Sequence, residues 1–127
     1  SKSITHIIKG YKLVPDEEEE IAKAIVYMSD ELKCDVILTT GGTGLAKRDV
    51  TPEATKSVLT REVKGIAESL RAHARRYEKH AALSRAVAGL RNNQSLIVNL
   101  PGRPNAVSSS LGVLLPMLRH AVRQLKS

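Results

Sequence analysis

A glycine-rich loop between a predicted buried strand and a predicted helix limits the fold and the function of this chain more than any other part of its sequence. The apolar run 36–38 indicates the strand, and the sequence TTGGTGLAKRDVTPE follows it over residues 39–53. Three glycines allow the backbone of such a loop to curl its N–H groups around an anion. Pro52 suits a first helical position, where we expect Thr51 to be the N-cap and Glu53 to complement the helix dipole. The segment therefore predicts an anion-binding site at the end of a strand.

The same loop carries a cation, Arg48, directly before a carboxylate, Asp49. A phosphate-bearing ligand needs the cation, and a magnesium ion bound to that phosphate needs the carboxylate. The GGTG sequence taken alone is equally consistent with a tight turn between a strand and a helix. The sequence Arg-Asp-Val-Thr-Pro close behind it favours the binding site over the turn.

Strands and helices are predicted to alternate along the chain. We expect strands at 7–14, 35–40, 86–90 and 95–100, and helices at 17–32, 52–59, 65–82 and from about 104 onward. The last two strands are predicted to pair as a hairpin, and Pro116 is expected to kink the final helix or to make it restart. This alternation predicts one α/β domain over residues 1–127, with a mostly parallel sheet covered on both faces.

Three predicted strand ends carry the candidate site. Open sheets of this kind bind ligands beyond the carboxyl ends of their strands. Asp16 follows the first predicted strand, the loop 41–49 follows the second, and the segment 101–104 follows the last. We therefore expect these three segments to meet, with Asp16 and Asp49 as candidate magnesium ligands or hydrogen-bond acceptors.

The net charge of +7 favours anionic partners. Nucleotides, phosphates, nucleic acid and acidic lipid all satisfy that charge, so it cannot choose among them. The chain has no Trp or Phe and three Tyr, and this lack of aromatic platforms disfavours stacking on single-stranded nucleic acid. We therefore expect an aliphatic core and no nucleic-acid partner. The basic face of the helix predicted over 65–82 is interpreted as solvated surface, with an anion-attracting rim as the alternative.

The sequence shows no pattern typical of a membrane, secreted or zinc-binding protein. No apolar run approaches the ~18 residues of a membrane span, and no signal-peptide pattern precedes Ser3. The single Cys34 excludes an internal disulfide and is interpreted as a structural thiol beside a buried strand. We therefore expect a cytoplasmic protein that does not contact a membrane.

The segment 39–53 resembles the signature of the molybdenum-cofactor biosynthesis proteins of the MogA/MoaB type. Related segments match at Val14-Pro15-Asp16, at Leu83-Ser84-Arg85 and at Asn99-Leu100-Pro101-Gly102, so the resemblance covers nearly the whole chain from about Leu13 onward. It implies a molybdopterin-binding fold of three αβα layers. For the active members of the family, it also implies the adenylylation of molybdopterin by ATP with magnesium and the release of pyrophosphate.

The resemblance also implies roles for particular residues. The two catalytic acidic positions of the family match Asp16 and Asp49, which are also the candidate magnesium ligands. The residues implied to hold the phosphates or to border the pterin pocket are Thr40, Gly41, Gly42, Thr43, Gly44, Arg48, Ser84, Pro101 and Gly102. Arg85 could belong to this site, or it could simply tie two elements together.

One departure from the family pattern leaves a second function open. The family normally begins with another strand and helix, which carry a Ser-Asp-Arg type motif and an Asp-x-Ser-Gly segment, and neither motif occurs before Ile7. A sheet without that strand would expose an unpaired edge or an uncovered apolar face. Either the chain is an amino-terminally truncated version of a longer natural protein, or it lacks part of the adenylylation apparatus. The alternative function is therefore a non-catalytic module that binds or delivers molybdopterin. The resemblance further implies a homotrimer or hexamer and a contact with the molybdenum-insertion protein.

Overall fold

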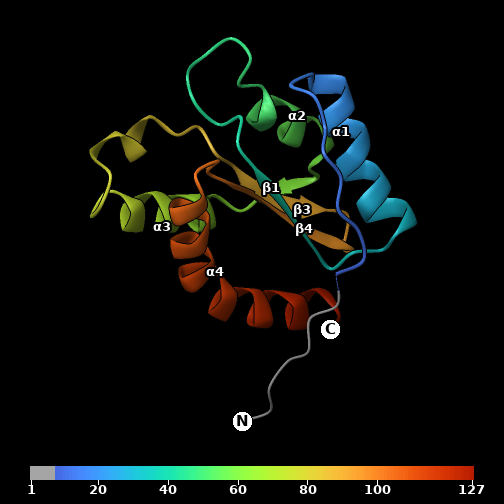
Figure 1. Ribbon diagram of the computed structural model, residues 1–127. Helices are drawn as coiled ribbons and strands as arrows, with labels where there is room; N and C mark the ends of the chain where they lie inside the picture. Colours follow the sequence, from blue (N-terminus) through green and yellow to red (C-terminus); the bar gives the residue numbers. More distant parts are fainter. Residues whose placement is uncertain (1–7) are drawn as a thin grey trace.

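A four-stranded sheet lies between two layers of helices in the computed structural model, which describes residues 8–127 (Figure 1). The strands are β1 (Val36–Thr40), β2 (Arg61–Glu62), β3 (Ala88–Arg91) and β4 (Ser95–Leu100), in the order β1-β4-β3-β2. The α/β fold is thus confirmed, but the sheet is mixed rather than mostly parallel. β1 and β4 are parallel, whereas the other two pairs are antiparallel. The reason is that β3 and β4 form the expected hairpin and that the short β2 pairs antiparallel with β3.

The helices cover both faces of the sheet, which gives the expected three layers. They are α1 (Glu18–Val26) with its π-helical continuation η1 (Tyr27–Glu31), α2 (Thr51–Val58), α3 (Lys64–Ala74), the 3₁₀ helix η2 (Lys79–Leu83) and α4 (Pro104–Leu125). One apolar cluster joins α1 and α2 to β1 and β4, and a second joins α3 and α4 to β3 and β4. In the part of the chain that the structure describes, no helix is both long enough and apolar enough to span a membrane.

Strand β4 contributes to both clusters because alternate side chains of a strand point to opposite faces. Leu96, Val98 and Leu100 belong to the cluster under α3 and α4, and Ile97 belongs to the cluster under α1 and α2. Asn99 lies on the same side as Ile97, where its amide reaches α2. All six residues of β4 are buried.

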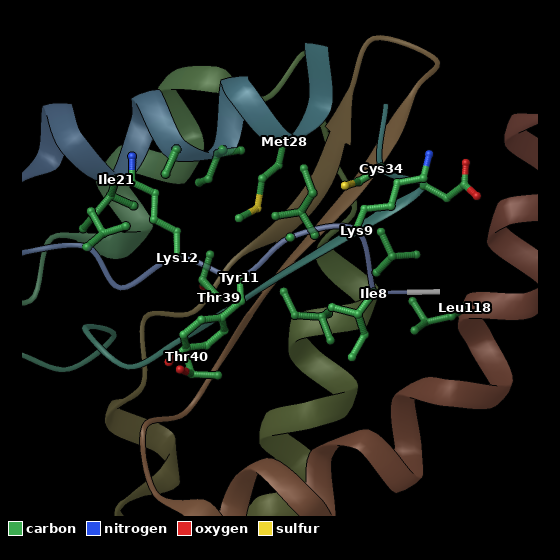
Figure 2. Close-up of a pocket in the computed structure, with 18 of the residues that line it drawn as sticks. Ile8, Lys9, Tyr11, Lys12, Ile21, Met28, Cys34, Thr39, Thr40 and Leu118 are labelled. Atoms are coloured by element: carbon green, nitrogen blue, oxygen red, sulfur yellow. The ribbon is translucent and has the colours of Figure 1, made fainter. Parts of the chain in front are cut away.

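The strand predicted at 7–14 is not present over the described residues 8–14. This segment pairs with no strand, and Ile8, Tyr11 and Leu13 are almost fully exposed. The pattern suited a strand, but a strand needs a neighbour to complete its hydrogen bonds. Between this segment and the outer edge of β1 lies a groove of about 970 Å³ (Figure 2). Within residues 8–127, the outer edge of β1 is therefore unpaired, as the resemblance led us to expect.

The first and third predicted helices have different limits in the structure, whereas the last predicted helix is continuous. The first helix begins with Glu17 as its N-cap, so Asp16 does not cap it. The helix predicted to reach residue 82 ends at Ala74 and is followed by a turn over residues 75–77. Glu78 is then extended, and its carboxylate accepts the N–H of His80 within η2. The last helix continues past Pro116 without a break. Figure 1 shows that it changes direction along its length, as expected from a lost hydrogen bond at proline.

Candidate functional site

The carboxyl ends of β1 and β4 lie side by side because these two strands are parallel. The N–H of Gly41 donates to the carbonyl of Leu100 at 3.0 Å. A Cβ on Gly102 would lie 3.2 Å from the Cα of Gly41, so the two backbones touch. The structure therefore brings the glycine loop and the segment 101–104 together.

The glycine loop is fixed to the start of α2 at Gly42. Gly42 has a φ of +69°, a conformation that favours glycine, and its carbonyl accepts the N–H of Thr51 at 3.1 Å. A Cβ at this position would lie 2.3 Å from Oγ1 of Thr51. Thr51 is the first residue of α2 rather than its N-cap, which is Val50.

Asp49 closes the tip of the loop. One of its carboxylate oxygens, Oδ2, accepts the N–H of Ala46 at 3.0 Å, and the N–H of Asp49 donates to the carbonyl of Ala46 at 2.9 Å. The same oxygen lies against Gly44, where an added Cβ would be 2.8 Å away. Asp49 is half-buried, whereas Arg48 is exposed. The second carboxylate oxygen accepts no hydrogen bond from a residue that the structure describes, and it can therefore meet a ligand.

Arg85, which lies shortly before β3, connects the loop to α2. Its Nε donates to the carbonyl of Gly44 at 2.8 Å, and its Nη2 donates to the carbonyl of Asp49 at 2.5 Å. Its Nη1 donates to the carboxylate of Glu53 in α2. Of the two roles that the sequence left open for Arg85, the tie between elements is therefore present. This hydrogen bond from Arg85 lowers the pKa of Glu53 below its ordinary value.

The lowered pKa of Glu53 predicts a loss of stability in acid. A carboxylate whose pKa is lower in the folded state stabilises that state above its unfolded pKa, and this contribution disappears as the pH falls through the folded pKa. We expect Glu53→Gln to destabilise the protein at pH 7 and to have a smaller effect near pH 3, because falling pH progressively protonates Glu53 and removes the contribution of its carboxylate. Urea unfolding at both pH values measures the difference. Glu68→Gln, at an exposed carboxylate of α3, is the control, and an equal effect of Glu53→Gln at both pH values would contradict the prediction.

Asp16 lies in a different place from Asp49. Asp16 is exposed and lines the groove beside β1 together with Thr40, Gly41 and Thr51, whereas Asp49 is not among the residues that line it. Figure 2 shows Thr40 beside Thr39 and Tyr11 among the residues that line this groove. Both regions adjoin Gly41, but nothing in the described contacts joins the two carboxylates.

The carboxylates of the candidate site could supply some of the ligands of a magnesium ion, but not all of them. Within residues 8–127, no group of three or more His, Cys, Asp or Glu side chains could hold a metal ion. Magnesium commonly binds through one or two carboxylates and completes its shell with water and substrate phosphates. Because Asp49 and Asp16 lie apart, each of them fits that mode as a single carboxylate ligand, with a phosphorylated substrate supplying the remaining ligands.

The remaining candidate residues lie at the edges of the loop. Ser84 is half-buried, and its hydroxyl accepts the N–H of Ala86, one residue beyond Arg85. The backbone N–H of Arg85 donates to the carbonyl of Thr43, so Ser84 is held close to the glycine loop. Pro101 follows β4 directly and precedes Gly102, which touches Gly41.

Two contacts near the site were not found from the sequence. The buried amide of Asn99 donates to the hydroxyls of Thr39 and Thr55, at 2.9 Å each, and so joins β4 to β1 and α2. Glu78 forms an ion pair with Arg103 at 3.1 Å, which ties the segment before η2 to the segment 101–104. A polar residue inside an apolar strand was a signal for Asn99, but no local pattern indicated the pair of Glu78 and Arg103.

Comparison with known proteins shows the family of this chain. A family model described as a probable molybdopterin binding domain of molybdenum-cofactor biosynthesis proteins matches residues 2–120. The chain belongs to this molybdenum-cofactor biosynthesis family. The family resemblance inferred from the loop is thereby confirmed. The match extends over nearly the whole described domain, including the glycine loop and the segment after β4.

Individual members of the family are similar over most of this chain. A molybdopterin adenylyltransferase of Helicobacter pylori strain J99 is 45% identical over 112 residues, which are 88% of this chain and 63% of that protein. The molybdopterin adenylyltransferase of Escherichia coli K12 is 44% identical over 100 residues, which are 79% of this chain and 51% of that protein. The chain thus spans between half and two thirds of the length of these curated relatives.

A solved structure of the family has the same fold. The molybdopterin biosynthesis enzyme MoaB of Thermus thermophilus superposes with a TM-score of 0.80 and is 50% identical. The match covers 87% of this chain and 69% of that protein. Its likeness confirms that the sheet and the two helical layers are those of the MoaB and MogA proteins.

Proposed function

We propose that this chain acts in molybdenum cofactor biosynthesis as a molybdopterin adenylyltransferase. The observation that carries the proposal is the glycine loop, which is fixed at Gly41 and Gly42 and keeps one carboxylate oxygen of Asp49 available. Family membership and the similarity to proteins named molybdopterin adenylyltransferase support it.

The proposed reaction transfers the adenylyl group of ATP to molybdopterin. An oxygen of the molybdopterin phosphate attacks the α-phosphorus of ATP, the bond between that phosphorus and the bridging oxygen breaks, and pyrophosphate leaves with the bonding electron pair. Such transfers depend mainly on alignment and on neutralising charge. We assign the N–H groups of the loop and Arg48 to the phosphates, and Asp49 and Asp16 to magnesium, which would neutralise part of the phosphate charge.

The alternative is a module that binds molybdopterin without adenylylating it. It is favoured by the position of Asp16, which lies exposed in the groove rather than in the loop with Asp49. In this function, the loop would hold the molybdopterin phosphate and the chain would need no ATP.

Calorimetry distinguishes the two functions. An adenylyltransferase is expected to bind molybdopterin and ATP and to release pyrophosphate when both are present with magnesium, whereas the module is expected to bind molybdopterin alone. The variant Gly42→Ala should lose molybdopterin binding, because its Cβ would meet Thr51 and its φ is positive. Gly112→Ala is the matched control, since a Cβ there meets nothing within 4 Å. Unchanged binding by Gly42→Ala, or none by the wild type, would refute both functions.

We also propose a cytoplasmic location, a homotrimer or hexamer, and a contact with the molybdenum-insertion protein. The resemblance to the family supports these proposals, and exposed apolar side chains such as Tyr77 and Leu83 suit contacts between copies. Light scattering after size-exclusion chromatography measures the assembly.

A further inference from the structure

We propose that Arg85 is a positioning residue that keeps three backbone N–H groups of the glycine loop, those of Gly44, Leu45 and Val50, turned toward the phosphate of the ligand. The inference rests on the proposed function, because it concerns the same loop. In addition to tying two elements together, Arg85 would then set the direction in which the peptide groups of the loop face.

Arg85 holds carbonyl groups on both sides of the exposed loop tip 45–48. Its backbone N–H donates to the carbonyl of Thr43 at 2.8 Å, and its Nε donates to the carbonyl of Gly44 at 2.8 Å. On the other side of the tip, its Nη2 donates to the carbonyl of Asp49. Three carbonyl groups of the loop are therefore drawn toward one residue.

A trans peptide unit points its N–H in the direction opposite to its C=O. The described chain contains no cis peptide bond. Since the carbonyls of Thr43, Gly44 and Asp49 face Arg85, the N–H groups of the residues that follow them must face away from it. These residues are Gly44, Leu45 and Val50, and none of their N–H groups donates to another described residue. Successive unbonded N–H groups, such as those of Gly44 and Leu45, can form an anion-binding concavity.

The guanidinium is itself fixed from α2 by the carboxylate of Glu53. Residues 45–48 are exposed, so the packing of their side chains contributes little to fixing the conformation of the loop tip. Without Arg85, the peptide groups could turn and present carbonyl oxygens, which repel a phosphate. Holding the loop in its binding conformation beforehand avoids the ordering cost on binding.

Arg91 provides a matched control at the opposite end of the sheet. Its Nε and Nη2 donate to the two carboxylate oxygens of Asp30, at 3.0 and 2.9 Å, and its Nη1 donates to the carbonyl of Val58 at 2.9 Å. It thus makes three guanidinium hydrogen bonds, as Arg85 does, but it pairs with Ser95 at the hairpin, far along β4 from the loop.

The test compares Arg85→Met and Arg91→Met by amide-resolved NMR titration with molybdopterin and, separately, with inorganic pyrophosphate. In the wild type and in Arg91→Met, both ligands should shift the amide signals of Gly44, Leu45 and Val50. In Arg85→Met, these shifts should be lost and the Kd for molybdopterin should rise at least about tenfold, as expected when a preorganised site becomes mobile.

Wild-type affinity of Arg85→Met, or an equal loss in both Met variants, would overturn the inference. If Arg85→Met does not fold, Arg85→Lys tests the inference instead. Its single ammonium group keeps the positive charge but cannot hold several carbonyl groups as the planar guanidinium does. It should show the same loss, and wild-type affinity would count against the inference. If pyrophosphate but not molybdopterin shifts the three wild-type amides, the proposed function fails and the inference stands. If neither ligand shifts them, the inference is overturned.

Discussion

Asp49→Asn is expected to lower the turnover of adenylylation by about 10²-fold or more while it preserves molybdopterin binding, as is typical when charge stabilisation is removed from an active site. The substitution is informative because the loop should keep its shape. Oδ2 of Asp49 accepts the N–H of Ala46, and an asparagine oxygen can accept the same hydrogen bond. The variant therefore removes the negative charge and leaves the acceptor in place. Pyrophosphate release under saturating ATP measures the turnover, and calorimetry measures the binding.

Glu68→Gln is the control for this experiment, because it also removes one negative charge, from the exposed surface of α3. It should leave the turnover unchanged. Turnover close to that of the wild type in Asp49→Asn would contradict the proposed role of the carboxylate. A loss of molybdopterin binding in the same variant would instead assign Asp49 to the structure of the loop.

Asn99→Ala should reduce the free energy of unfolding by about 2–4 kcal/mol, from a buried N–H left without its acceptor and from the cavity that the truncation leaves. Asn99 is 1% exposed, and its Oδ1 accepts the N–H of Val87 at 3.1 Å. Its amide donates to Thr39 and Thr55, so three segments of the chain lose a shared partner. Such a change is a large part of the ~5–15 kcal/mol that stabilises an ordinary domain.

Urea unfolding followed by circular dichroism measures this loss, since the chain has no Trp and its Tyr11, Tyr27 and Tyr77 are all exposed. Asn93→Ala is the control: Asn93 is exposed in the hairpin turn between β3 and β4, and we expect less than about 0.5 kcal/mol. If Asn99→Ala were no more destabilising than Asn93→Ala, the network around Asn99 would contribute nothing to stability.

Much of the fold could be predicted because its signals are local. The strand 95–100 was predicted with the limits that the structure has, since a short apolar run after a turn-rich segment is typical of a hairpin strand. The segment 7–14 had a similar pattern but needed a neighbouring strand that the sequence could not show, and its described part is unpaired. The third helix ends earlier than its apolar pattern predicted, and Glu78, which follows in an extended conformation, accepts an N–H two residues later.

The candidate site was predictable where it depends on strand direction. The parallel pairing of β1 and β4 brings Gly41 to Gly102, and both the strands and the loops were readable from glycine and proline positions. The partners of Arg85 and Asn99 lie 12 to 60 residues away in sequence, and no local pattern identifies them. Asp16 was expected beside Asp49 because a strand was assigned before it, and without that strand it lies in the groove instead.

The buried, central strand β4 is among the last parts of the molecule to open. β4 is paired with β1 on one side and with β3 on the other, and it is covered by helices on both faces. Local opening starts where few apolar contacts hold the chain, and strands of this kind exchange their amide protons mainly when the whole domain unfolds. Both the glycine loop, through Gly41, and the segment 101–104 are attached to this strand. The helices at the periphery can therefore fray while the ligand-facing ends of the sheet hold their spacing.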